Sequence, residues 1–141
     1  MIVQGQTTLF KLNLLKGLEN FAVGTPYTYK IALYTAFASL DNTTTAYTSS
    51  NEVVGTGYTA GGQALTIIPP PDSNSANTAW VSFQPAIWNP AGFTTRGALI
   101  YNSTTGAACF VLNFGSDKVA SSTFTVQFPT ADASSAIIRI S

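Results

Sequence analysis

The chain contains no histidine, only one cysteine and few charged residues. Without histidine it can form neither a Ser-His-Asp nor a Cys-His nucleophilic system, and it lacks the commonest metal ligand of proteins. A single cysteine excludes an intrachain disulfide and a cysteine-based structural zinc site. Cys109 lies inside an apolar run, where we expect a small buried hydrophobic residue rather than a reactive thiol.

Charged residues make up 9% of the chain, against about 25% in an average domain, and six cations balance six anions. The cations are scattered, so the sequence predicts no nucleic-acid partner. The carboxylates are also isolated along the chain, which argues against the paired carboxylates of a glycosidase, and residues 72–74 (DSN) are too short for a calcium loop. We therefore expect a protein that is not an enzyme and that binds no metal or cofactor.

Long apolar runs are also missing. No stretch of about 18 apolar residues is present, so we expect no membrane span, and residues 1–17 show no pattern of a signal peptide. The 45% of hydrophobic residues is nevertheless enough for a core of its own, and a length of 141 residues predicts a single domain over 1–141. A neutral surface with few charges suits a protein held in an assembly, although neutral Thr- and Ser-rich surfaces also occur on extracellular β-domains.

Residues 7–21 contain the one predicted helix, with Thr7 or Thr8 as its N-cap and an end near residues 17–19. Leucines recur at a spacing of three from Leu9 and give the helix a broad apolar face. We treat residues 1–21 as an N-terminal arm and helix that packs on its own sheet or reaches a neighbouring subunit.

The remaining chain predicts about eight short strands separated by Gly, Pro, Ser and Asn. Their centre is a hairpin over residues 94–115, whose two apolar arms flank the turn NSTTG. Residues 27–33 alternate as in a strand with one buried face, and Gly55 and Gly57 indicate a bulge or a close backbone approach. Further strands are expected near residues 64–68, 78–83, 87–88, 124–128 and 136–140. The pattern favours a mainly β fold, an antiparallel β-sandwich of jelly-roll or Greek-key type, with one short N-terminal α-helix.

Seven residues are predicted to contact a partner. Trp88 lies in a segment broken by prolines, where we expect it to cover a sheet end. Arg96 and Arg139 are strand cations in a nearly uncharged protein, where pairing with a carboxylate at an edge or interface is typical. We expect Asp117 and Lys118 to form a solvated turn within residues 116–122. The predicted interface residues are Leu9, Phe10, Leu14, Trp88, Arg96, Asp117 and Arg139.

Aromatic side chains provide a different hypothesis, because aromatic faces stack on sugar rings. Packing in the core or at an interface is the alternative explanation for the same residues. The residues concerned are Tyr47, Tyr58, Trp80, Trp88 and Phe93.

Several segments of the chain, taken together, cover much of residues 29–140 and form a recognisable set. They are residues 29–34 (YKIALY), 43–47 (TTTAY), 51–53 (NEV), 55–62 (GTGYTAGG), 96–102 (RGALIYN), 113–118 (NFGSDK), 128–129 (FP) and 136–140 (AIIRI). The set resembles small virion proteins of tailed bacteriophages. The resemblance implies a structural component of the virion and transfers no catalytic residue.

Composition and resemblance together lead us to expect a capsid decoration (cement) protein that stabilises the assembled head. Its partners would be the major capsid protein or other virion proteins, and it would form a homo-oligomer, with a trimer favoured. Its location would be the virion, assembled in the host cytoplasm. A tail, collar or fibre-attachment protein is the alternative, and a carbohydrate-binding adhesin domain is a further one. For a shell contact we expect Arg96 or Asp117 at the hairpin base to be used, rather than the hairpin tip.

Overall fold

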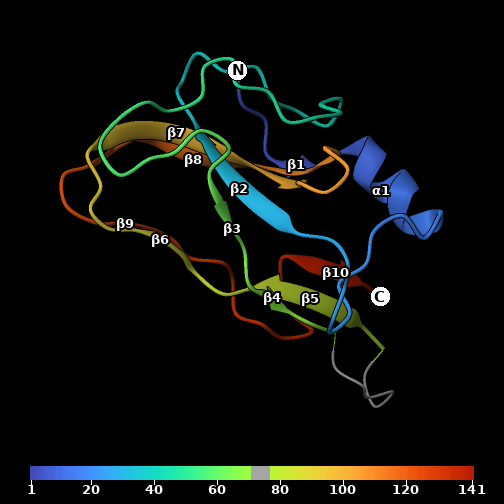
Figure 1. Cartoon of the computed structure of the whole chain (residues 1–141). Helices are drawn as coiled ribbons and strands as arrows, with labels where there is room; N and C mark the ends of the chain where they lie inside the picture. The colour runs from blue at the N-terminus through green and yellow to red at the C-terminus, as the bar shows by residue number, and fades with distance from the viewer. Residues whose placement is uncertain (71–76) are drawn as a thin grey trace.

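A computed structural model describes residues 1–70 and 77–141 (Figure 1). The predicted loop that follows residue 68 lies largely outside these residues. The helix is α1 (Thr8–Leu15), and the strands are β1 (Gly5–Gln6), β2 (Tyr29–Tyr34), β3 (Gln63–Ala64), β4 (Ile67–Ile68), β5 (Ala79–Phe83), β6 (Ala86–Trp88), β7 (Phe93–Asn102), β8 (Ala108–Ala120), β9 (Phe124–Val126) and β10 (Ile138–Ile140).

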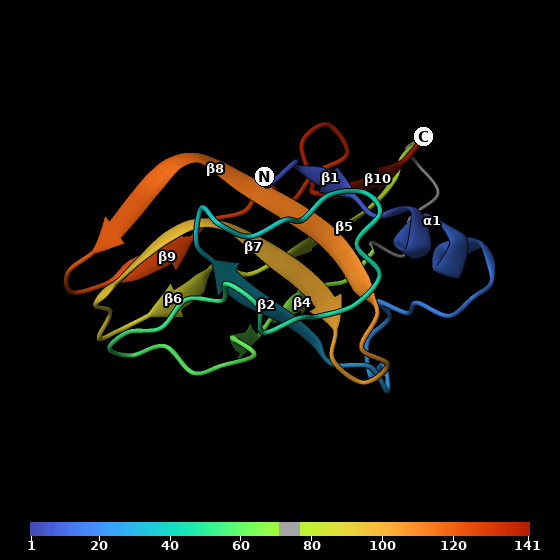
Figure 2. The same cartoon turned by 90° about the horizontal axis from the view of Figure 1, so that it is seen from above.

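The strands pair into three sheets. The largest has the order β1-β8-β7-β2-β3, the second has the order β10-β5-β4, and the third consists of β6 and β9. Every pairing between these strands is antiparallel. The prediction of a mainly β, antiparallel fold with one short N-terminal helix is therefore confirmed. The finer prediction of a β-sandwich is not confirmed, because the strands divide among three sheets. Figure 2 shows β8 as a long curved strand beside β7, with α1 at one end of the molecule and β6 and β9 at the other.

The predicted central hairpin consists of β7 and β8, and β7 is the middle strand of the largest sheet. Its apolar arms pair directly, with Leu99 opposite Val111. The turn predicted at residues 116–122 is wrong, because β8 continues to Ala120 and pairs again with the start of β7 after a register shift. Ser and charged residues there resemble a turn in sequence, but residues 118–120 pair with residues 93–95 of β7 and so continue the strand. The hairpin tip is also less free than expected, since the Thr104 hydroxyl accepts the Thr28 N–H at 3.0 Å.

Strand β2 is buried on both faces, which its alternating sequence did not predict. Ile31 and Leu33 belong to the main core, while Ala32 and Tyr34 belong to a second core cluster. The second face is covered by residues 35–62, which are held there by the Tyr34 hydroxyl donating to the Thr48 carbonyl at 2.6 Å and by further backbone bonds. A segment without regular secondary structure therefore covers the face of β2 that the alternating sequence predicts to be exposed to solvent.

The strand predicted at residues 64–68 is divided between two sheets. Its first part is β3, which pairs with β2, and its second part is β4, which pairs with β5. The change of sheet occurs next to buried Leu65, whose N–H donates to the Tyr29 carbonyl at 2.8 Å. The close approach predicted at the glycines is confirmed, because a Cβ on Gly57 would lie 1.8 Å from the carbonyl oxygen of Pro90.

Helix α1 begins as predicted and is shorter than predicted. Thr7 is its N-cap, since its side-chain oxygen accepts the Phe10 N–H at 3.0 Å. The helix ends at Leu15, and Gly17 follows in the left-handed region with φ of 70°, a common helix stop. Phe10 is fully buried against Phe110, with ring centroids 4.5 Å apart, and so attaches α1 to the main core. In the part of the chain that the structure covers, no helix is long and apolar enough to cross a membrane.

Candidate interaction site

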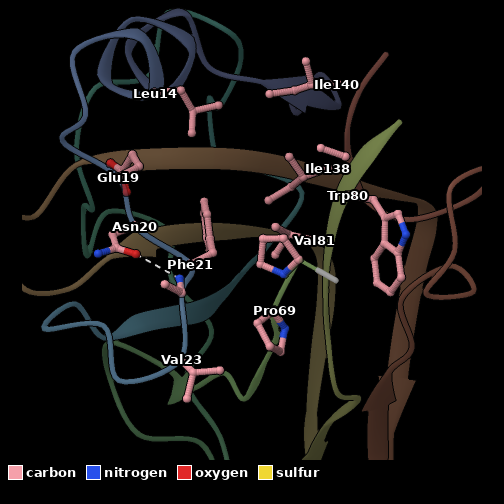
Figure 3. A pocket seen from close by; sticks show the side chains of 13 residues that line it. Leu14, Glu19, Asn20, Phe21, Val23, Pro69, Trp80, Val81, Ile138 and Ile140 are labelled. Carbon is pink, nitrogen blue, oxygen red and sulfur yellow. Dashed lines mark hydrogen bonds between the residues drawn. The ribbon is translucent and has the colours of Figure 1, made fainter. Parts of the chain in front are cut away.

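An apolar groove lies between the N-terminal segment and the sheet of β5 and β10 (Figure 3). It encloses about 650 Å³. One wall comes from α1 and the segment after it, and the opposite wall comes from β5 and β10, with the prolines after β4 between them (Figure 3). The lining side chains are mostly apolar and include Leu14, Phe21, Val23, Pro69, Trp80, Val81, Ile138 and Ile140.

The first wall of the groove is positioned by aromatic contacts. Phe21 is buried and stacks on Tyr29 of β2, with ring centroids 4.6 Å apart, and it also meets Phe10 edge-on. These contacts bring residues 19–23 onto the end of the large sheet. Val23 is 88% exposed beside the groove, so the wall carries an apolar side chain that the chain itself leaves uncovered.

Glu19 is the buried carboxylate in the groove lining. Its Oε2 accepts the Tyr29 hydroxyl at 2.6 Å and the Asn102 amide N–H at 3.2 Å. Burial, followed by this bond to Glu19, raises the pKa of Tyr29. The other oxygen, Oε1, is buried and has no hydrogen-bond partner among the described residues. The groove therefore combines apolar walls with one carboxylate whose hydrogen bonds attach it to the core.

A second buried carboxylate, Glu52, lies at the centre of a tyrosine cluster. Its two oxygens accept the hydroxyls of Tyr47 and Tyr58, both at 2.6 Å, and the Gly61 N–H at 2.7 Å. The Tyr101 hydroxyl donates to the Gly61 carbonyl at 2.7 Å. Burial first, and the neighbouring Glu52 charge or hydrogen bond after it, raise the pKa values of these three tyrosines. This cluster fixes residues 35–62 against the sheet.

The remaining described carboxylates make surface contacts. Asp117 pairs with Arg96 at 2.9 Å, and Asp41 and Asp132 accept bonds within their own turns. The pairing expected for Arg96 is therefore confirmed, although such a half-exposed pair contributes only about 0–1 kcal/mol. Among the described residues no group of three or more possible metal ligands exists. The short acidic segment at residues 72–74 lies outside them.

The predicted interface residues do not form one surface. Phe10 is fully buried and Trp88 is 5% exposed, so both belong to the core and present no face to a partner. This corrects the prediction for these two residues: Trp88 packs on Phe93 and Phe124 under the β6–β9 sheet instead of covering an open sheet end. Leu9 and Leu14 are half-buried on α1, and of the two Leu14 reaches the groove.

The charged members of the predicted interface lie elsewhere. Arg96 and Asp117 face each other on β7 and β8, where Asp117 lies within a strand and not in the expected turn. Arg139 is exposed on β10, and its guanidinium donates to the Ser134 carbonyl rather than to a carboxylate. None of the three lines the groove.

The aromatic hypothesis for sugar binding loses two of its five residues, because Trp88 and Phe93 are buried. The hydroxyls of Tyr47 and Tyr58 donate hydrogen bonds to the Glu52 carboxylate. Trp80 alone of the five lines the groove.

Sequence reasoning missed Val23 and Ile140 as exposed apolar residues beside a groove. No local signal marks these two residues, because Val23 lies in an irregular segment and Ile140 in a short apolar strand, and their exposure depends on how distant segments pack. Cys109 is buried as predicted, and burial raises the pKa of its thiol.

Comparisons with protein-family models, curated proteins and solved structures find no match to this chain. The resemblance to phage virion proteins therefore stays a prediction.

Proposed function

We propose that the protein is a non-enzymatic structural component of a phage virion, and specifically a capsid decoration protein that stabilises the assembled head. The observation that supports this proposal most is the apolar groove beside the exposed Val23 and α1. Exposed apolar surface around a hollow is typical of protein–protein contact sites. In this proposal an apolar side chain of the major capsid protein, or of another virion protein, fills the groove.

The fold proposal belongs with this function. We infer that the two smaller sheets act together as the second layer of a β-sandwich facing the five-stranded sheet. Contacts between the layers support this arrangement: Phe93 of β7 meets Trp88 of β6 and Phe124 of β9. Phe83 of β5 shares the main core with Ile31 of β2. A rigid sandwich would present the groove as a preformed surface, so little ordering cost opposes binding.

The proposed mechanism is stabilisation by mass action. A protein that binds the assembled shell and not its free subunits lowers the free energy of the shell. Each groove contributes a modest contact, and many copies on one particle add their contributions. The low charge content and the net charge of zero fit such a role, because a neutral surface avoids repulsion between neighbouring copies.

The experiment is quantitative mass spectrometry of purified particles combined with a groove variant. Copy numbers on the order of hundreds support decoration, whereas about six or twelve copies point to a tail or collar position instead. Val23→Asp should remove the protein from the particle, because it places a charge in the apolar contact. Val119→Asp is the matched control, since Val119 is also exposed, at 77%, and lies on β8 outside the groove. Equal particle occupancy for both variants would contradict the groove as the contact.

A further inference from the structure

Strand β10 forms a free edge of its sheet. In the order β10-β5-β4 it pairs with β5 on one side, and its backbone makes no hydrogen bond to any other described residue. An edge strand directs the N–H and C=O groups of alternate residues outward, in a row that the backbone of another strand matches. The outer edge of β10 can therefore accept one more strand.

The two faces of β10 border two different hollows. Ile138 and Ile140 line the apolar groove, together with Leu14 of α1 (Figure 3). Arg139, which lies between them, lines a second hollow of about 560 Å³ together with Gln6 of β1. The lining of this second hollow is mostly polar and also includes Thr78, Ser134 and Ser141. Unfilled space therefore lies between β10 and the β1–α1 segment on both faces of the strand.

Strand β1, which borders the polar hollow, is also a terminal strand of its sheet. Gly5 pairs with Val111 of β8, and the Thr7 N–H donates to the Cys109 carbonyl at 2.9 Å. Because antiparallel strands bond through alternate residues, Gln6 directs its backbone N–H and C=O away from β8. Neither of these two groups bonds to a described residue. The polar hollow is thus bordered by unpaired backbone groups from the edges of two sheets.

We propose that an extended segment of another protein adds to the free edge of β10 as a further strand. Successive side chains of a strand point to opposite faces, so alternate apolar side chains of the segment enter the groove and those between them face the polar hollow. The inference rests on the proposed function for the source of the segment, a virion protein. It specifies the form of that segment, a strand in which apolar and polar residues alternate.

Arg139 adds a charge to this recognition. Its guanidinium donates to the Ser134 carbonyl, and among the described residues no carboxylate forms an ion pair with it. The carboxylate of Asp132 accepts the N–H groups of Ser134 and Ser135 instead. A guanidinium has five N–H donors, so several are free to bind a carboxylate of the added strand. We therefore expect an acidic side chain at the position of the segment that lies beside Arg139.

A second copy of the chain fits this edge less well. Pairing the whole of β10 with itself about a two-fold axis would place the two copies of Arg139 directly opposite each other, where like charges are destabilising. The strand spans only three residues, so it offers few backbone bonds. We expect a dissociation constant above about 1 µM for a single segment, and many copies on one particle would add their contacts.

Fluorescence anisotropy with labelled synthetic peptides and the full chain, at up to about 1 mM protein, tests the proposal. The first peptide is Val-Thr-Val-Glu-Val-Thr-Val, and the second has Lys in place of Glu. We expect the Glu peptide to bind at least about tenfold more tightly than the Lys peptide, and Arg139→Glu to reverse this order. Lys118→Glu is the matched control, because Lys118 is an exposed cation on β8, and it should leave the order unchanged.

Backbone pairing is tested by methylating the backbone nitrogens of the Glu peptide. Alternate N–H groups of a strand point to opposite edges, so two peptides are compared, one methylated at the Val nitrogens and one at the nitrogens between them. We expect one peptide to lose binding and the other to keep it, because only one set faces β10. Equal effects of the two sets, no binding of the Glu peptide, or an order unchanged by Arg139→Glu would overturn the inference.

The outcome of the peptide experiment is independent of the particle experiment. Peptide binding as expected, together with equal particle occupancy of Val23→Asp and Val119→Asp, would contradict the groove contact of the proposed function and support the added strand. Loss of Val23→Asp from the particle without any peptide binding would overturn the added strand and leave the proposed function standing. Thermal unfolding of Arg139→Glu confirms that this exposed substitution leaves the fold intact.

Discussion

Gly62 shows how single residues decide the path of residues 35–62 over the sheet. It has φ of 74°, and a Cβ there would lie 1.7 Å from the Ile31 carbonyl oxygen. Two requirements therefore coincide at one position, a left-handed backbone and direct contact with strand β2. Gly106 in the hairpin turn also has a positive φ, of 84°, but nothing lies within 4 Å of its Cβ position.

The pair Gly62→Ala and Gly106→Ala separates these two requirements. Gly106→Ala should lower the free energy of unfolding by about 1 kcal/mol, the cost of the left-handed conformation alone. Gly62→Ala should cost more than about 3 kcal/mol, because the backbone of β2 must also move. Chemical denaturation measures both values. Losses of equal size would show that the close approach does not contribute to stability.

At the scale of elements, the attachment of α1 to the large sheet depends on one buried threonine, Thr7. The Thr7 side chain accepts the Phe10 N–H at the start of the helix and donates to the Ala108 carbonyl of β8 at 2.8 Å. Thr7 is fully buried, so the same hydroxyl caps the helix and attaches it to the large sheet. The orientation of α1, and with it the position of Leu14 in the groove wall, follows from this contact.

Thr7→Ala should therefore lower the free energy of unfolding by about 2–3 kcal/mol, since it removes a cap and leaves a buried carbonyl without its donor. Thr8→Ala is the matched control. The Thr8 side chain is exposed and only its backbone N–H is used, so its loss should stay within about 0.5 kcal/mol. Urea denaturation compares the two variants. Equal effects would mean that the hydroxyl of Thr7 is not what attaches the helix.

At the scale of the whole molecule, tyrosine hydroxyls connect the loops to the sheets. Five tyrosines have pKa values raised by burial, and for each of them Glu19 or Glu52 adds to the rise. Raised values mean that the folded protein holds these phenol protons more tightly than the unfolded chain does. Their contribution to stability is complete below the ordinary tyrosine pKa of about 10 and is lost as the pH rises above it.

We expect the denaturation midpoint to fall steeply between about pH 9 and about pH 11, with tyrosinate absorbance rising together with unfolding. Tyr34→Phe removes one of these protons, and so it should make the fall less steep while lowering stability at neutral pH through the lost bond to Thr48. A midpoint that is constant across this range would contradict the tyrosine contribution.

The proposed sites illustrate what sequence patterns miss. The helix begins where the sequence predicts, with Thr7 as its cap, because capping and leucine spacing are local signals, although it ends earlier than predicted. Of the predicted contact residues on α1, however, Phe10 is core, and the exposed leucines are Leu12 and Leu15. The helix is apolar on several faces, so its periodicity could not tell which face meets the sheet.

The amino-acid sequence by itself determined the mainly β class, the helix start and the central hairpin, since these depend on neighbours within a few residues. Tertiary structure alone decided that β8 continues into its turn-like segment as far as Ala120 and that residues 35–62 cover β2. It also decided that Glu19 binds Asn102, which is 83 positions away in the chain. Contacts over such separations leave no local pattern, because they exist only once the sheets have brought distant side chains together.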